Sequence, residues 1–493
     1  MISELGQSFE GLKRLMDPES LMIVGVSQRL MSWGYVVAKN SIESGFKGRV
    51  YFVNPSIGSL FGVKVFPRVK DVPSPVDLAV LILPADLTPS ALEDCASIGV
   101  KVAVVISSGF SEAGEQGKKL EDEVVKVARR NNVRVLGPNC NGVYNVDAGL
   151  NVSWISKRII TPRPIAFISQ SGFLAYSLSY WGKTRGLGFG KFVSVGNQCD
   201  INVTELLEYF GQDPAVKAIM LYVEGVKEGR RFMETAKRVS LVKPVIALKA
   251  GLEEAGARAS LAHTGALTGS KRVYEAAFKQ AGVIQASKPE NLLVLAAALS
   301  SMPRLKGPNI GVVTMGGGWG VISTDELTSR GLKVPELPQQ LKERLKQILK
   351  KPRVSVLNPV DIGPAWPLEF KTIVEAVNLL IASEAVDGVL THSLTLTDHA
   401  KSIGINEGHP RFESVKEWEA LTAMLNLMNV YGKPIAFVTP LSREQCETVK
   451  RLEDDGWVVL HSVDEAVTVL KGMLDYHYAL TRLKQRLTRS GPS

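Results

Sequence analysis

Two stretches of the sequence decide the fold: IAFISQSGFLAYSLSYWGKTRGL (residues 165–187) and IGVVTMGGGWGVISTDELTSRGL (residues 310–332). They align without a gap at an offset of 145 residues, so that a strand, a glycine turn, a helix and a terminal Arg-Gly-Leu coincide. Such self-similarity indicates a duplicated structural unit. We therefore expect two flavodoxin-like domains of related topology.

The rest of the chain continues the same rhythm. From residue 21 onward, short β-branched runs alternate with helical stretches of about ten to fifteen residues, which is typical of βαβ units around a parallel sheet. The first series ends at the turn-rich segment 137–142, and we expect a linker through Arg163 after it. The sequence predicts an α/β protein of three doubly wound domains: a Rossmann-like domain over 1–145 and flavodoxin-like domains over 160–302 and 306–493.

Composition places the chain among ordinary globular proteins. Its 493 residues are 45% hydrophobic and 22% charged, which supports several cores and excludes a mostly disordered chain. No stretch approaches the roughly 20 apolar residues of a bilayer crossing, and the N-terminus lacks a secretory apolar core, so we expect a cytoplasmic protein without a membrane segment. The four cysteines are far apart and without metal-ligand spacing, so neither a disulfide framework nor a zinc site is expected.

The formal net charge of +9 is compatible with nucleic acid, anionic lipid or a polyanionic small molecule. The densest basic run, residues 342–353, keeps Leu and Ile at helical spacing and contains no aromatic residues that would stack on bases. This run is therefore expected to be a solvated helix face. We expect no nucleic-acid partner, and a multiply phosphorylated small molecule accounts for the remaining basic excess.

The first glycine turn, residues 25–29, joins a strand to a helix but does not have the pattern of a dinucleotide site. It lacks the second and third glycines that let a pyrophosphate approach the backbone, and the next strand ends in Asn54-Pro55 instead of an acidic residue. A nicotinamide-dependent dehydrogenase is therefore disfavoured. The helix start at this turn would still hold another phosphate-bearing ligand.

Two further turns follow neighbouring strands in the second domain. Ser169–Gly172 and Gly196–Gln198 each precede a helix, which aims backbone N–H donors and a positive dipole end at one point. Ser171, Gly172, Gly196 and Asn197 are thus candidates for binding phosphate. Turns that need glycine only for their backbone geometry are the alternative on pattern alone.

The loop SLAHTGALTGS, residues 260–270, carries the first histidine of the chain. Its small residues leave His263 unobstructed, and a neutral imidazole accepts a phosphoryl group near neutral pH. Glu224, at the end of a predicted strand, is suited to orient the imidazole by accepting a hydrogen bond from the N–H of its other ring nitrogen. The alternatives are a surface histidine and a solvated strand-end carboxylate.

These motifs, taken in this order and spacing, resemble the α subunit of ADP-forming acyl-CoA (acetyl-CoA) synthetases. That family belongs to the nucleoside-diphosphate-forming superfamily that includes succinyl-CoA synthetase. The resemblance covers nearly the whole chain. The matching segments are VNP (53–55), VDLAVLILPA (76–85), ISSGFSEAG (106–114), GPNCNG (137–142), SQSG (169–172), VSVGNQCD (193–200), LYVEGVKEGRRF (221–232) and AHTGALTG (262–269).

The resemblance implies the reversible conversion of acyl-CoA, ADP and phosphate into the acid, CoA and ATP, through an acyl phosphate and a phosphohistidine at His263 steadied by Glu224. It implies that coenzyme A lies across the first domain. The implied contacts are Ser27, Gln28, Pro55, Pro84, Ser107, Ser108, Gly109 and Phe110.

No segment resembles the ATP-grasp module that binds the nucleotide in this family, so the resemblance implies a separate ATP-grasp β subunit. That subunit would hold ADP or ATP and Mg²⁺, with no metal ligands in this chain, in an α2β2 heterotetramer. The third domain favours the acetyl-CoA branch. A succinyl-CoA synthetase-type α subunit and a non-catalytic CoA-binding regulatory protein remain the alternatives. The sequence departs from the family pattern at Ala262, Leu30-Met31 and Met315.

Overall fold

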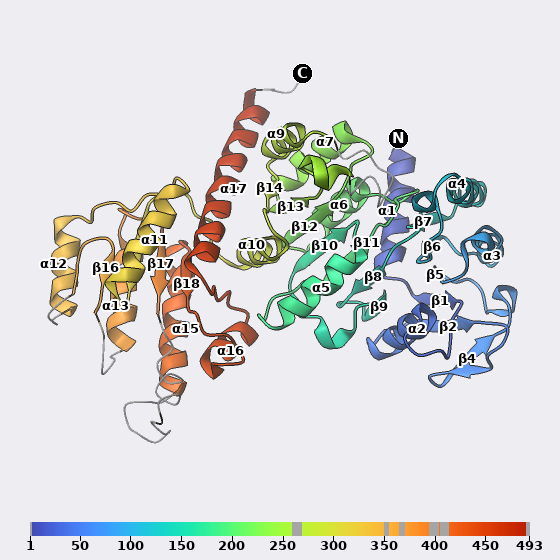
Figure 1. Cartoon of the computed structure of the whole chain (residues 1–493), viewed down its shortest axis with the longest axis horizontal. Helices are drawn as coiled ribbons and strands as arrows, with labels where there is room; N and C mark the ends of the chain where they lie inside the picture. Colours follow the sequence, from blue (N-terminus) through green and yellow to red (C-terminus); the bar gives the residue numbers. More distant parts are fainter. Residues whose placement is uncertain are drawn as a thin grey trace. The chain divides into compact units, whose positions relative to one another are not determined.

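The computed structural model describes residues 2–258, 269–349, 354–363, 370–393, 404 and 414–489. The chain divides into two compact units. Unit 1 comprises residues 1–183 and 188–292, and unit 2 comprises residues 184–187 and 293–493. Unit 1 contains two mainly parallel sheets and unit 2 contains a third (Figure 1), which confirms the predicted doubly wound α/β class.

The first sheet of unit 1 has seven strands in the order β3-β4-β2-β1-β5-β6-β7. The strands are β1 (Ser20–Val24), β2 (Arg49–Val53), β3 (Ser59–Leu60), β4 (Val63–Phe66), β5 (Leu78–Leu81), β6 (Val102–Val105) and β7 (Arg134–Leu136). The helices of this part are α1 (Ile2–Met16), α2 (Trp33–Glu43), α3 (Thr88–Ser97) and α4 (Glu115–Arg130). All pairings except that of β3 with β4 are parallel, as β-branched, doubly buried strands favour.

The second sheet has seven strands in the order β14-β13-β12-β10-β11-β8-β9. The strands are β8 (Gly142–Asn145), β9 (Leu150–Ser153), β10 (Ile165–Ser169), β11 (Lys191–Ser194), β12 (Ala218–Val223), β13 (Val245–Lys249) and β14 (Ile284–Gln285). The helices of this part are α5 (Gly172–Lys183), α6 (Val203–Gln212), α7 (Gly229–Ser240) and α9 (Lys271–Ala281). The next helix, α10 (Pro289–Ser301), begins in unit 1 and belongs to unit 2 from Leu293 onward.

One hydrophobic cluster runs through both sheets of unit 1. Alternate residues of β1 face opposite sides, so Leu21 and Ile23 belong to this cluster while Met22 and Val24 pack with α3 and α4 in another. The shared cluster continues through Ile168 of β10 and the helices on that sheet. The two domains of unit 1 therefore have a common core.

The expected linker through Arg163 was wrong in its first half, because residues 142–145 and 150–153 form the antiparallel strands β8 and β9 of the second sheet. These strands, GVYN and LNVS, contain polar residues that look like loop residues in sequence. Their polar groups are satisfied internally instead: the Asn145 side-chain amide donates to the Met16 carbonyl at 2.9 Å, for example.

The sheet of unit 2 has, in the described residues, four parallel strands in the order β16-β15-β17-β18. These are β15 (Ile310–Thr314), β16 (Val360–Asp361), β17 (Gly388–His392) and β18 (Ile435–Val438). Its helices are α11 (Gly317–Ser329), α12 (Gln339–Ile348), α13 (Phe370–Ala382), α15 (Ser414–Tyr431), α16 (Glu447–Asp454) and α17 (Val463–Arg489). In the described part of the chain, no helix has the length and apolarity needed to cross a membrane.

The duplication predicted from the sequence is confirmed in the strand order. β15 and α11 begin 145 residues after β10 and α5, and β15 lies between β16 and β17 as β10 lies between β11 and β12. The pairing registers also correspond, because Ser169 pairs with Ser194 and Tyr222 while Thr314 pairs with Asp361 and His392. Residues at equivalent places in the two copies can therefore be compared directly.

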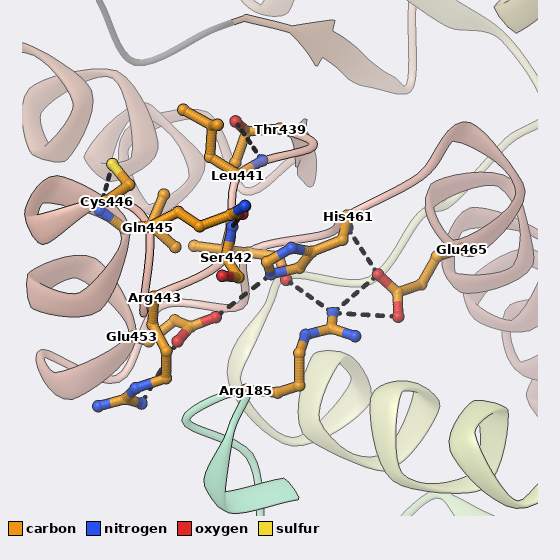
Figure 2. Close-up of polar contacts among 12 residues, drawn as sticks. Arg185, Thr439, Leu441, Ser442, Arg443, Gln445, Cys446, Glu453, His461 and Glu465 are labelled. Atoms are coloured by element: carbon orange, nitrogen blue, oxygen red, sulfur yellow. Dashed lines mark hydrogen bonds and ion pairs between the residues drawn. The ribbon is translucent and has the colours of Figure 1, made fainter. Parts of the chain in front are cut away.

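A polar network inside unit 2 fixes the short segment 184–187 (Figure 2). The Arg185 guanidinium donates to both carboxylate oxygens of Glu465, at 3.1 and 2.9 Å. The Glu465 carboxylate also accepts from the His461 backbone amide at 2.7 Å. Next to it, the buried carboxylate of Glu453 lies 3.4 Å from His461 Nε2 and 3.3 Å from an Arg443 nitrogen. Buried carboxylates paired in this way avoid the penalty of an isolated buried charge.

Replacing Phe210 of α6 by alanine is expected to lower the free energy of unfolding of unit 1 by about 3–5 kcal/mol, because the ring is fully buried in the shared cluster. Amides of β1 and of β10 should lose hydrogen-exchange protection together. Val242→Ala, at a side chain that is 69% exposed, is the control and should change stability by less than about 0.5 kcal/mol. Loss of protection in β10 alone would contradict a common core.

Candidate functional site

The candidate site lies where strand order reverses in each sheet of unit 1. β1 lies between β2 and β5, and β10 lies between β11 and β12. Ligands of open α/β sheets bind at the carboxyl ends of the strands at such reversal points. A cavity of about 680 Å³ is lined by loops from both places, which we call the first cavity.

The first cavity brings together seven of the predicted site residues. They are Pro84, Ser107, Ser108, Ser171, Gly172, Gly196 and Asn197. The remaining predicted coenzyme contacts do not line it, namely Ser27, Gln28, Pro55, Gly109 and Phe110. The Phe110 ring is fully buried in the core of the first domain, so its side chain does not reach a ligand.

Close packing fixes the start of α5 at this cavity. A Cβ atom at Gly172 would lie 2.4 Å from Asn141 Cβ, so only glycine fits there. The Asn141 side-chain amide donates to the Gly172 carbonyl at 3.1 Å, and its oxygen accepts from the Trp154 backbone amide at 2.9 Å. Amides of a helix's first turn have no acceptor within the helix, so this helix start can bind an anion.

The turn after β11 is held by side chains of the first domain. Asn197 Nδ2 donates to Glu112 Oε2 at 2.6 Å and to Glu121 Oε2 at 2.9 Å, and Ser111 Oγ lies 3.1 Å away. The Asn197 backbone amide donates to the Pro138 carbonyl at 2.9 Å. Asn197 thus ties this turn to the 107–114 loop, and its own donors are already used.

Glu112 is also bound to its own loop. Its Oε1 accepts from the backbone amides of Gly109 and Phe110, at 2.6 and 3.1 Å. Burial raises the pKa of Glu112, but these hydrogen bonds and that of Asn197 outweigh burial and hold the pKa below its ordinary value. The carboxylate is therefore charged at neutral pH and fixes the loop that lines the first cavity.

Glu224, the predicted partner of His263, lies at the end of β12 and is 4% exposed. Gln170 Oε1 accepts from the backbone amides of Glu224 and Gly225, at 2.5 and 3.2 Å. Burial and the Glu224 carboxylate raise the pKa of Tyr222 to about 12. Burial lowers the pKa of Lys249 to about 8 while Glu224 opposes that shift, and the Lys249 ammonium lies 4.5 Å from the centre of the Tyr274 ring.

His263 itself lies outside the residues that the structure describes, so its predicted role remains a prediction. The described residues contain no group of three or more His, Cys, Asp and Glu side chains arranged to hold a metal ion.

A second cavity, of about 940 Å³, adjoins the first, and Gln170, Gly196 and Asn197 line both. Gly225 and Val226, which follow Glu224, and three lysines line the second cavity. One of these, Lys227, donates from Nζ to the carbonyls of Asn197 and Gln198, at 3.1 and 2.7 Å. The 196–198 turn, which separates the two cavities, is thus held by Lys227 through its carbonyls and by Glu112 and Glu121 through the Asn197 side chain.

Sequence reasoning missed Gln170, Asn141, Glu112, Glu121 and Lys249. Three of them stand inside quoted motifs, Gln170 in SQSG, Asn141 in GPNCNG and Glu112 in ISSGFSEAG, but only the fold shows what they contact. Glu121 and Lys249 belong to no motif. Glu121 lies on the highly charged helix α4, and nothing in the sequence indicates that its carboxylate is buried against Asn197, 76 residues away.

The equivalent place in unit 2 has different chemistry. Asp361 occupies the register position of Ser194, and a Cβ at Gly317 would lie 3.2 Å from its Oδ2. The start of α11 therefore already faces a carboxylate. Trp319 stacks on His392 with ring centres 4.1 Å apart. Among the residues that the structure describes, no carboxylate is placed against the start of α5 in this way.

Comparison with known families agrees with this geometry. Residues 19–146 match the family described as CoA binding domain, and residues 162–299 match the succinyl-CoA ligase like flavodoxin domain. The protein is therefore of the class that combines these two domains in acyl-CoA ligases.

The chain is 43% identical over 355 residues to the acetate–CoA ligase [ADP-forming] I subunit alpha of Pyrococcus furiosus, a match that covers 71% of this chain and 76% of that protein. The chain belongs to this family, the α subunits of ADP-forming acetate–CoA ligases. An acetate–CoA ligase [ADP-forming] of Methanocaldococcus jannaschii is 39% identical over 364 residues, which are 73% of this chain and 50% of that protein.

A solved structure resembles the whole chain. It is the dinucleotide forming acetyl-coenzyme A synthetase 1 of Ca. Korarchaeum cryptofilum, in complex with phosphate and ADP. The TM-score is 0.84 at 33% identity, and the match covers 98% of this chain and 99% of that chain. The likeness therefore includes the third domain.

The buried Lys249 predicts a pH-dependent stability. An unfolded lysine keeps its proton to a pKa of about 10.4, whereas the folded one releases it near 8. Between these values the unfolded chain binds more protons, so the wild type gains stability as the pH rises. The free energy of unfolding of Lys249→Met minus that of the wild type should therefore decrease from about pH 8 to 10.5 in urea titrations.

The exposed Lys279→Met serves as the control, and its difference from the wild type should stay constant over the same range. A pH-independent difference for Lys249→Met would contradict the assignment of a buried ammonium with a lowered pKa.

Proposed function

We propose that the two strand-reversal points of unit 1 form the coenzyme A and phosphate sites of an ADP-forming acyl-CoA synthetase. As a member of its family, the chain is a ligase of this type and uses coenzyme A and a nucleotide. The observation that carries the proposal is the first cavity, which joins loops of the CoA-binding domain to the start of α5. A thioester and a phosphate would meet there.

The residues of the first cavity fit an acyl thioester and its pantetheine arm. Trp33 and Trp154, with ring centres 4.6 Å apart, form an apolar part of the lining, and Ser107 and Ser108 supply hydroxyl groups. The start of α5 lies in the same lining, where its amides would donate hydrogen bonds to a phosphate oxygen and stabilise its negative charge. Apolar walls with a few convergent polar groups are typical of such sites.

The proposed reaction has three transfers. A phosphate oxygen attacks the thioester carbonyl, the carbon–sulfur bond breaks, and CoA leaves as the thiolate, giving an acyl phosphate. His263 then attacks phosphorus, the phosphorus–oxygen bond breaks, and the acid leaves as the carboxylate. ADP finally takes the phosphoryl group from His263 to give ATP. Each transfer depends on positioning and charge stabilisation more than on covalent work by the protein.

Glu224 would orient the His263 ring by accepting a hydrogen bond from the N–H of the ring nitrogen that does not react. The position of Glu224 supports this role, because Gln170 accepts a hydrogen bond from the Glu224 backbone amide and so holds it next to Gly225, which lines the second cavity. Lys249, whose charge interacts with that of Glu224, would favour the ionised carboxylate.

A partner subunit would complete the enzyme. The family name describes an α subunit. The match to an ADP-forming ligase of M. jannaschii covers 73% of this chain but only 50% of that ligase, so the ligase contains a second part that has no counterpart in the match. We infer a separate ATP-grasp β subunit that holds the nucleotide and Mg²⁺, in an α2β2 assembly in the cytoplasm. The likeness that extends over the third domain supports the acetyl-CoA branch above a succinyl-CoA synthetase-type subunit or a CoA-binding regulator.

Labelling tests this proposal. The chain, mixed with its partner subunit, Mg²⁺ and radiolabelled ATP, is expected to acquire an acid-labile, base-stable label at His263, and His263→Asn should acquire none. Glu224→Gln should slow labelling by about 10- to 100-fold, because the ring loses its orienting acceptor. The exposed Glu234→Gln is the matched control and should label at the wild-type rate. Label that survives in His263→Asn would refute the phosphohistidine.

A further inference from the structure

Three residues line both cavities of unit 1, and two of them, Gln170 and Asn197, carry side-chain amides. Gln170 follows β10 and Asn197 follows β11, and both line the first and the second cavity. The two amides look interchangeable in sequence, since each stands in a turn that precedes a helix. Their hydrogen bonds in the structure are opposite.

Asn197 has no donor left for a ligand. An amide NH2 group has two hydrogens, and its nitrogen already faces Glu112 Oε2 at 2.6 Å and Glu121 Oε2 at 2.9 Å. Two carboxylates hold this group strongly, because hydrogen bonds to ionised acceptors are the stronger ones. The Asn197 side chain therefore joins two loops.

Gln170 presents the opposite end of its amide. Its Oε1 accepts from two backbone amides, those of Glu224 and Gly225, at 2.5 and 3.2 Å. Turning the amide over would place its NH2 group against these two N–H donors, so the orientation is determined. Within the described part of the chain, Gln170 Nε2 has no hydrogen-bond partner. Its two donors remain for a ligand between the cavities.

The copy in unit 2 separates the fold of this turn from its chemistry. Met315 stands at the position of Gln170, and its sulfur accepts from Ser393 Oγ at 3.1 Å. The same strand, turn and helix therefore form without an amide. In that copy the carboxylate of Asp361 lies against the start of α11 and would repel an anion. The turn that carries Met315 in place of the amide donor is therefore also a turn that does not suit an anion.

We propose that Gln170 is a phosphate-contacting catalytic residue, which donates hydrogen bonds from Nε2 to oxygens of the phosphate that attacks the thioester and of the acyl phosphate that results. This inference rests on the proposed function. Because the same side chain accepts from the Glu224 backbone, it links the position of the phosphorus atom to the position of the carboxylate that orients His263. A neutral donor can hold the phosphate without neutralising its nucleophilic oxygen.

The test uses the complex of this chain with its partner subunit, and measures phosphate-dependent CoA release from acyl-CoA with ADP and Mg²⁺. Gln170→Glu keeps the shape and replaces the donor by a negative oxygen, and Gln170→Met is the residue that the folded copy carries. The KM for phosphate is expected to rise by roughly 10- to 150-fold in Gln170→Met, as the loss of a hydrogen bond to a charged ligand predicts, and by more in Gln170→Glu.

The KM for acyl-CoA should change by less than about twofold in both variants. A general loosening of the fold would instead raise the KM values for phosphate and for acyl-CoA together. Gln285→Met, at an exposed glutamine of β14, is the matched control and should leave both constants unchanged. If either folded variant keeps the wild-type KM for phosphate, Gln170 does not contact phosphate. Should the wild-type complex release no CoA in a phosphate-dependent manner, the proposed function fails instead, so the two failures are distinguishable.

Discussion

The candidate site depends on one amide group, the side chain of Asn197, held between the carboxylates of Glu112 and Glu121. Glu112 in turn binds the backbone of the 107–114 loop. Through these contacts a turn of the second sheet is joined to a loop of the first sheet. The shared hydrophobic cluster beneath them fixes the sheets that carry these loops. A thioester held by one domain and a phosphate held by the other would consequently meet in a constant geometry, which reactions of this kind require.

The duplicated sheets of units 1 and 2 show how one backbone arrangement accommodates different chemistry. Strand order, register and helix starts correspond in the two copies. The differences lie in a few side chains at the strand ends, Gln170 against Met315 and Ser194 against Asp361. Because a carboxylate already faces the start of α11, the third domain is not suited to a second phosphate. The fold is shared, while the site depends on particular residues.

Sequence patterns predicted the long, apolar elements well. The predicted alternation of strands and helices is observed, and the duplication at an offset of 145 residues is confirmed by β10 with α5 and β15 with α11. The patterns missed α1, the hairpin β3–β4 and the strands β8 and β9. These last strands are short and contain Asn and Ser, whose polar groups are satisfied by particular partners: Asn145 donates to the distant Met16 carbonyl, and Asn151 accepts from the Ser153 amide two residues away. Periodicity carries no information about such partners.

The site was predictable only in part, for the same reason. Glycine turns mark where an anion can approach a helix start, and Ser171 and Gly172 do lie at the start of α5 and line the first cavity. Gly196 lines the same cavity, but the prediction that its turn opens a helix was wrong, because α6 begins at Val203 after the N-cap Asn202. Which amide offers a donor depends on which atoms its neighbours already occupy, and that distinction between Gln170 and Asn197 exists only in the folded chain. The buried ring of Phe110 is a similar case, because burial is a property of the packed domain.

The most direct measurement is a crystal structure of the complex of this chain with its partner subunit, grown with phosphate and a non-reactive thioether analogue of acyl-CoA. The account predicts a phosphate oxygen at hydrogen-bond distance, about 2.7–3.2 Å, from both Gln170 Nε2 and the Gly172 amide, with Asn197 still bound to Glu112. A phosphate bound only among the lysines of the second cavity, with Gln170 Nε2 donating to protein or water, would contradict it.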